Sequence, residues 1–203
     1  IKNESTQGYT GGITGYCNGS LENSGNSANV ISNIDSDGSF SVGGICSSIG
    51  GGEAEVKKCY NIGNIEGKNE IGILYIGGIT GCDNNSSGQI IENCYNTGKI
   101  IGNAQTLRIG GIIGYQFDTI ESCYNIGNVE GIAVDELNIG MLVGRTYSSN
   151  AIINNAYYQK NDNNIKGIGT REDSENMLKT ETEMKEENFV DLLNQTNNGW
   201  KKD

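Results

Sequence analysis

Six cysteines are the residues of this 203-residue chain with the most obvious chemical potential. A zinc site would need thiolates brought together, usually as CxxC pairs or with His, and a catalytic Cys would need a neighbouring base. The chain has no CxxC pair and no His. Cys59, Cys94 and Cys123 instead recur at one position of a repeat, which predicts a column of small buried thiols. Disulfides between successive rungs remain an alternative, and we expect no catalytic residues and no cofactor.

Four tyrosines also recur at one position, directly after the Cys column. A side chain that follows an inward residue on a strand points outward, so Tyr60, Tyr95, Tyr124 and Tyr157 should form an outward row. An exposed aromatic row can bind sugars or protein partners, but it can also be a stack of neighbours covered by a loop. These four residues are therefore the candidate ligand-binding residues.

One run of polar residues resembles the start of a calcium-binding loop. It contains Asn33, Asp35, Asp37 and Gly38, but Gly44 stands where the closing Glu would be. Alignment with the repeats makes the run a degenerate corner. We prefer that interpretation and expect no metal, with Asp35 and Asp37 kept as the alternative calcium ligands.

The elements that must position these residues follow from two alternating sequence blocks. A Gly-Gly-Ile-x-Gly block recurs with its first glycine at positions 11, 43, 77, 110 and 140. Between these copies lies a Cys-Tyr-Asn-x-Gly block, at 59–63, 94–98 and 123–127. A degenerate copy is assigned to 30–40, with Ile34 in the Cys place, and a late one carries Ala156 there. Asn61, Asn96 and Asn125 predict a ladder of amide hydrogen bonds.

The apolar residues of the blocks fall into four columns. No repeat could bury a core alone, but stacked repeats join into one continuous interior. Glycine every few residues disfavours helical repeats. We therefore predict an all-β fold, a right-handed parallel β-helix or β-solenoid of about five repeats, over residues 1–165. The predicted columns are Ile31, Val56, Ile91, Ile120 and Ile153; Ile34, Cys59, Cys94, Cys123 and Ala156; Phe40, Ile65, Ile100 and Val129; and Ile13, Ile45, Ile79, Ile112 and Leu142.

Residues 166–203 differ in character from the repeats. Their apolar and acidic residues predict a helix over 182–194, with Thr180 or Thr182 as its N-cap and glutamates in its first turn. A solenoid needs its open end covered. We expect this segment, with Trp200 after the helix, to be the C-terminal cap.

The formal net charge of −11 makes nucleic-acid binding and attraction to anionic membranes unfavourable. No apolar run is long enough to span a bilayer, so we expect no membrane insertion in this segment. The chain begins at Ile1 and not at Met, which suggests a processed fragment of a longer protein.

The Gly-Gly-Ile-x-Gly block followed by Cys-Tyr-Asn-x-Gly resembles the GLUG-motif repeats over most of residues 10–160. Met141 and Ser47 depart from the pattern, each in place of a glycine. Such repeats occur in secreted or wall-attached bacterial proteins, including adhesin-like proteins and non-catalytic regions of IgA-specific metallopeptidases. The resemblance implies a β-helical fold at an extracellular or cell-surface location, and no single activity.

The expected function is a non-catalytic structural and adhesion domain, with a host protein or a carbohydrate as its partner. The first alternative is an accessory region of a secreted metallopeptidase, since this segment lacks the H-E-x-x-H motif of a catalytic part. The second is a polysaccharide-processing β-helix enzyme, which would need clustered acids. In this sequence the acids are scattered through the repeats and dense only near the C-terminus.

Overall fold

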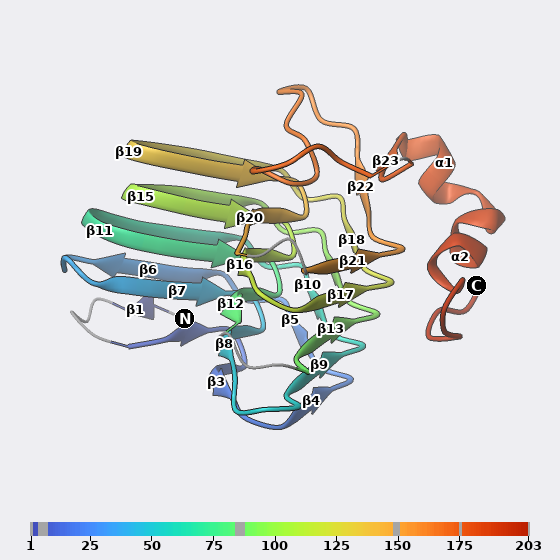
Figure 1. The fold of residues 1–203 in the computed structure, drawn as a ribbon, viewed down its shortest axis with the longest axis horizontal. Helices are drawn as coiled ribbons and strands as arrows, with labels where there is room; N and C mark the ends of the chain where they lie inside the picture. The colour runs from blue at the N-terminus through green and yellow to red at the C-terminus, as the bar shows by residue number, and fades with distance from the viewer. Residues whose placement is uncertain (1, 4–7, 84–87, 148–150, 175, 203) are drawn as a thin grey trace.

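The computed structural model describes residues 2–3, 8–83, 88–147, 151–174 and 176–202. Its strands form four parallel sheets, here called A to D, in which each strand pairs with its counterparts in the neighbouring coils (Figure 1). The predicted β-solenoid is thus confirmed. Sheet A contains β1 (Lys2–Asn3), β2 (Thr10–Gly11), β6 (Val30–Ile34), β7 (Ser39–Gly43), β11 (Ile65–Gly77), β15 (Ile100–Gly110) and β19 (Val129–Gly140).

The other three sheets consist of shorter strands that complete each coil. Sheet B contains β3 (Thr14–Cys17), β8 (Cys46–Ile49), β12 (Thr80–Asp83), β16 (Ile113–Gln116) and β20 (Val143–Thr146). Sheet C contains β4 (Ser20–Glu22), β9 (Glu55–Lys57), β13 (Ile90–Glu92), β17 (Thr119–Glu121) and β21 (Ile152–Asn154). Sheet D contains β5 (Gly25–Asn26), β10 (Tyr60–Asn61), β14 (Tyr95–Asn96), β18 (Tyr124–Asn125), β22 (Tyr157–Gln159) and β23 (Leu178–Lys179).

The register of the first coil differs from the predicted one. Val56 pairs with Leu21 and not with Ile31, and Ile65 pairs with Val30 and not with Phe40. The true first copy of the Cys-Tyr-Asn block is therefore 24–28, in which Ser and Gly replace Cys and Tyr. Backbone pairing with the next coil sets this register, because the lost Cys and Tyr left no sequence signal to align.

Two other predicted column members also have different partners. Ile34 pairs with Asn69, and Phe40 pairs with Leu74 on the far side of the bend between β6 and β7. Both therefore belong to sheet A. The remaining column members keep their predicted positions, and the buried ones join a single core that runs through the stacked coils. Ile13 was also predicted to face the core, but in the first coil it is 47% exposed.

Both glycines of the Gly-Gly block are required by close contacts between backbones. A Cβ on the first glycine would lie 1.9 Å from the carbonyl oxygen three residues later, as at Gly43 and Gly77. A Cβ on the second would meet the next coil and the Asn of the other block: at Gly78 it would lie 2.1 Å from Gly111 O and 2.6 Å from Asn96 Cγ. The two blocks recur together because they pack on each other.

Met141 shows why the last coil can depart from this pattern. It stands at the second-glycine position, and its side chain is buried in the core. In that coil Tyr158 pairs with Asn125, so no asparagine follows in the ladder position. The side chain at 141 therefore has room that the earlier coils lack.

A corner residue with positive φ precedes the Cys column in every coil. At this position the φ angles lie between 47° and 53°, and three of the five residues are Asn, which tolerates this conformation best after Gly. The five are Asn23, Lys58, Asn93, Ser122 and Asn155.

Lys58 offers a test of this corner, because it is exposed and lacks the local hydrogen bonding of Asn. We expect Lys58→Asn to raise the free energy of unfolding by about 0.5 kcal/mol. Lys58→Ala also lacks the local side-chain hydrogen bonding of Asn and should give no gain. Urea unfolding of both variants measures the difference, and equal stabilisation by Ala and Asn would contradict the explanation.

The helix of the C-terminal segment covers a different part of the molecule from the one predicted. The helix forms near the expected place, as α1 (Glu181–Lys185) and α2 (Glu187–Leu193), with Thr180 capping α1. It lies beside sheet D and not over the end of the solenoid (Figure 1). The end is covered by residues 166–169, at the start of the predicted capping segment, and their Lys166 and Gly167 carbonyls accept from Met141 N and Leu142 N. Ile168 adds its side chain to the core there.

Candidate functional site

The cysteine column is a structural part of the core. Cys59, Cys94 and Cys123 are fully buried, and all six cysteines of the chain are free thiols. Cys59 N donates to Cys94 Sγ, and Cys94 N to Cys123 Sγ, each at 3.4 Å. The hydrogen bond with Cys94, together with burial, raises the pKa of Cys59, and burial raises the pKa of Cys94. The Cys59 and Cys94 thiols therefore stay protonated, so they are packing groups and poor nucleophiles.

The predicted amide ladder is present and longer than expected. Asn26 donates to Asn61, Asn61 to Asn96, and Asn96 to Asn125, each through Nδ2 to Oδ1 at 2.8 Å. Asn125 ends the ladder on the carbonyl of Met141. The ladder holds the coils in register and supports Tyr60, Tyr95 and Tyr124, each of which directly precedes a ladder Asn on sheet D.

The tyrosines of the predicted site form a stacked row. The Tyr60 and Tyr95 rings lie 5.3 Å apart and nearly parallel, and those of Tyr95 and Tyr124 lie 5.1 Å apart at 4°. Tyr157 continues the row in sequence but is only 7% exposed and meets Phe189 edge-on. The structure therefore brings the four residues onto one face, called here the Tyr face. The Tyr60 end of this face is the part most exposed to solvent.

The C-terminal segment partly covers the Tyr face. The Trp200 ring lies 5.3 Å from that of Tyr124 and 6.0 Å from that of Tyr95, and its Nε1 donates to Ser122 O. Phe189 of α2 meets Tyr124 at 5.7 Å. Sequence reasoning foresaw a covering loop only as an alternative. No repeat pattern could indicate which side of the solenoid this segment would take.

A groove of about 650 Å³ remains between the Tyr face and the C-terminal segment. Burial raises the pKa of Tyr124 to about 12, so its phenol is neutral and can both donate and accept hydrogen bonds. The groove thus combines flat aromatic surfaces with polar groups at its rim. Its aromatic lining is Tyr95, Tyr124, Phe189 and Trp200, and its charged rim is Glu181, Lys185, Glu186, Glu187, Lys201 and Lys202.

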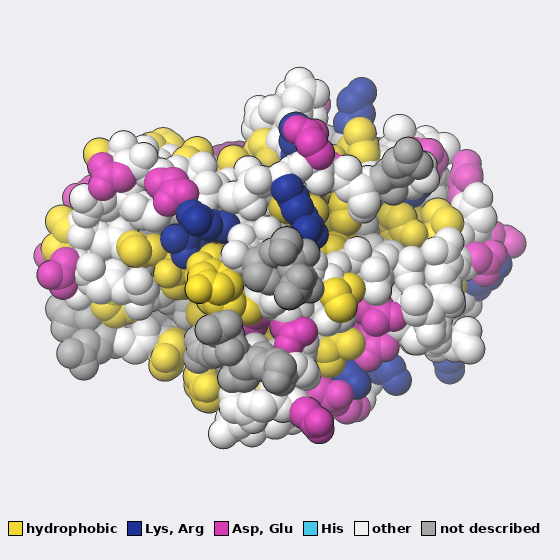
Figure 2. Space-filling model, in the orientation of Figure 1, with side chains coloured by type: hydrophobic (Ala, Val, Ile, Leu, Met, Phe, Trp, Pro, Cys, Tyr) yellow, Lys and Arg dark blue, Asp and Glu magenta, His cyan; other side chains and the backbone are white. Residues whose placement is uncertain are grey.

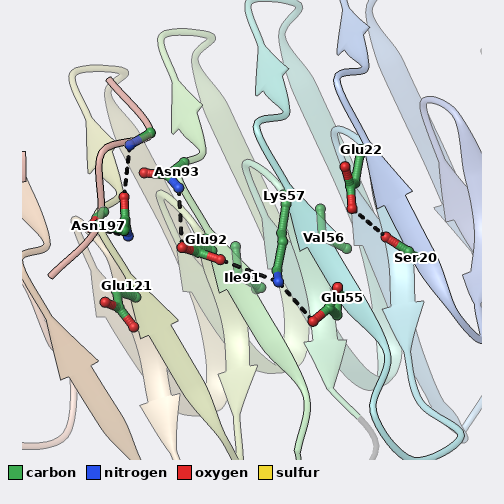
Figure 3. Close-up of polar contacts among 12 residues, drawn as sticks. Ser20, Glu22, Glu55, Val56, Lys57, Ile91, Glu92, Asn93, Glu121 and Asn197 are labelled. Carbon is green, nitrogen blue, oxygen red and sulfur yellow. Dashed lines mark hydrogen bonds and ion pairs between the residues drawn. The ribbon is translucent and has the colours of Figure 1, made fainter. Parts of the chain in front are cut away.

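The stacked repeats also bring acidic side chains together, whereas the sequence predicted that the acids are scattered. Register places Glu22, Lys57, Glu92 and Glu121 in one column on the outside of sheet C (Figure 3). Lys57 Nζ lies 2.7 Å from Glu55 Oε1 and 3.4 Å from Glu92 Oε2. Within the described residues, no group of His, Cys, Asp and Glu side chains is arranged to hold a metal ion. The column is a solvated, partly ion-paired sheet surface.

The alternative calcium ligands lie at the bend between β6 and β7. Asp35 and Asp37 are both exposed there. In the part of the chain that the structure describes, no further His, Cys, Asp or Glu joins them in a metal-binding group. Their surroundings are those of a surface bend.

A cluster that the sequence did not indicate lies where sheets A and B meet. It consists of Tyr75, Arg108, Tyr115, Phe117 and Tyr147, which come from three successive coils. The residue type changes from coil to coil, so no column of identical residues marks it. Only the stacking of the coils places these residues together.

Asp83 is a buried carboxylic acid at the end of β12. It accepts hydrogen bonds from Phe117 N at 2.6 Å and from Asp118 N at 3.1 Å. Burial, reinforced by the charge of Asp118, outweighs these bonds and raises the pKa of Asp83 to about 7. This side chain therefore links folding to pH.

We expect the protein to lose stability as the pH rises through neutrality. Because the folded pKa of Asp83 is raised above its ordinary value of 3.8, its contribution is complete below about pH 4 and is lost as the pH passes about 7. Between about pH 5 and about pH 8 the free energy of unfolding should fall by about 2–3 kcal/mol more than in Asp83→Asn. Urea unfolding at the two pH values tests this, and parallel pH dependences of the two proteins would contradict it.

Fold and site together define a β-solenoid repeat protein that presents aromatic surfaces on its sides. No family model, curated protein or solved structure matches this chain in sequence or fold comparisons. Among the described residues, the helices are too short and too polar to cross a membrane.

Proposed function

We propose that this chain is a non-catalytic adhesion module of a bacterial protein that is secreted or displayed at the cell surface. The carrying observation is the aromatic groove between the Tyr face and the C-terminal segment. Its flat rings, neutral phenols and charged rim are suited to a carbohydrate or a protein segment. The GLUG-like repeats favour the same role.

The stacked coils support binding more than catalysis. The cysteines are buried, burial raises the pKa of Cys94, and the chain has no His to act as a base. The acids of sheet C lie in register along the outside of a sheet, whereas catalysis needs groups that converge on one reacting atom. The solenoid thus acts as a rigid support for a lateral binding surface.

Binding assays with single-residue variants test this function. The probes are a glycan array, purified peptidoglycan and a mucin glycoprotein, and we expect the protein to bind at least one of them. Tyr95→Ser removes a ring from the groove floor and should weaken that binding at least tenfold. Tyr9→Ser, which removes a 53% exposed ring away from the groove, should leave it unchanged.

Two results would overturn the proposal. One is binding that Tyr95→Ser and Tyr9→Ser affect equally. The other is release of a cleaved product from the bound probe, detected by mass spectrometry, since the module would then be an enzyme.

A further inference from the structure

We propose that the cluster around Arg108 is a second binding site, separate from the groove, which takes a carboxylate-bearing saccharide. The cluster lies at the corner of the solenoid where sheet A leads into sheet B. Figure 2 shows hydrophobic and basic side chains next to each other over this region, which contains the ends of β11 and β15 and the strands β16 and β20.

Arg108 lies between two aromatic rings. Its guanidinium carbon is 4.1 Å from the centre of the Tyr115 ring and 5.1 Å from that of Tyr75, and the two rings stack at 5.1 Å. Nη1 donates to Tyr75 Oη at 3.4 Å. A guanidinium held by aromatic faces has lost side-chain freedom in advance, so less entropy is lost when it binds a ligand.

Arg108 forms no ion pair with the described residues. Within the described residues, no carboxylate lies at ion-pair distance from it, although the chain carries 25 acids against 14 basic residues. The neighbouring Arg145 shows the usual arrangement, with Nη1 2.7 Å from Glu136 Oε1. An unpaired guanidinium at such a corner is a donor fork for an external carboxylate.

The aromatic rings around Arg108 offer a ligand more contact surface than an ion pair with the guanidinium alone. Tyr115 meets Phe117 edge-on at 4.7 Å, and Phe117 stacks on Tyr147 at 4.3 Å. Tyr147 is 58% exposed, while Phe117 and Tyr115 are half-buried. Flat rings at right angles beside a cation fit the apolar faces of sugar rings that carry a carboxylate.

An acidic saccharide fits this surface better than an acidic peptide does. The site is a set of ring faces beside a guanidinium, and flat ring faces match the apolar faces of sugar rings. The overall charge of −11 gives no long-range attraction for anions, so recognition must come from short-range contacts with the guanidinium and the rings. A sugar that carries a carboxylate can make both of these contacts.

Titration calorimetry with defined oligosaccharides tests the site. The probes are an oligogalacturonate, its methyl ester and a poly-glutamate peptide. We expect the oligogalacturonate to bind at least tenfold more tightly than its ester, with an affinity that falls as salt is raised. Arg108→Gln should reduce that affinity at least tenfold, while Arg171→Gln, which removes one positive charge elsewhere, should leave it within twofold.

Each contrary outcome overturns the proposal. These are equal binding of the ester, equal effects of Arg108→Gln and Arg171→Gln, and Arg108-dependent binding of the peptide alone. Should Arg108→Gln fail to fold, Tyr147→Ser removes an exposed ring of the same site and must weaken oligogalacturonate binding. Tyr95→Ser should have no effect here, so this site and the proposed groove can fail separately.

Discussion

Replacing Asn96 by Asp should lower the free energy of unfolding by about 3–5 kcal/mol, a large part of the 5–15 kcal/mol typical of a domain. The side chain is fully buried in the middle of the amide ladder. Its Nδ2 donates to Asn125 Oδ1 at 2.8 Å and to Gly98 O at 2.9 Å, and its Oδ1 accepts from Asn61. A carboxylate of the same shape would place an acceptor against two acceptors and bury an unpaired charge.

Chemical unfolding with a surface control measures this effect. Asn103→Asp makes the same chemical change at an exposed position of β15 and should alter stability by no more than about 0.5 kcal/mol. Lowering the pH should narrow the deficit of Asn96→Asp, because the introduced carboxyl is then neutral. Equal midpoints for the two variants would show that the ladder contributes nothing to stability.

Replacing Gly78 by Ala should lower the free energy of unfolding by about 3 kcal/mol. The added Cβ would lie 2.1 Å from Gly111 O in the next coil and 2.6 Å from Asn96 Cγ. The first contact is with backbone that is itself paired, so relief requires the coils to move apart. Asn96→Ala in the same chain should therefore fail to rescue the variant.

A second glycine provides the matched control for this prediction. At Gly38 the nearest atom to an added Cβ is a ring carbon of Phe40 at 3.2 Å, on a side chain that can move. Gly38→Ala should be neutral or stabilise by a few tenths of a kcal/mol, because Ala restricts the unfolded chain. If thermal unfolding shows similar losses for both variants, close coil packing is not the reason for the second glycine.

The periodic features could be predicted because each recurs with the same residue type. Cys59, Cys94 and Cys123 occupy one column, and Asn61 and Asn96 lie two residues after theirs, so the column and the ladder both follow from the alignment. The first coil could not be aligned in this way, since Ser24 and Gly25 stand where later coils have Cys and Tyr. The prediction for the first coil was wrong because it rested on residue similarity, whereas backbone pairing with the next coil sets the register.

The candidate sites likewise combine features that the sequence indicates with features that it does not. The tyrosine row was visible in the sequence, but its partial cover by Trp200 and Phe189 was not, because packing of a non-repeating segment depends on which apolar face it meets. Asp83 gave no signal of its raised pKa, which arises from burial under residues 117 and 118.

The repeat pattern of the sequence was enough to predict the solenoid, its inward cysteines, its amide ladder and its row of tyrosines. These depend on one rule applied in every coil, namely that like residues stack on like at a fixed spacing. Three features emerge from the folded coils alone: the register of the first coil, the side on which the C-terminal segment packs, and the cluster of Arg108 with Tyr75 and Tyr115. Each of these joins unlike residues from different coils, and such contacts exist only once the coils are stacked.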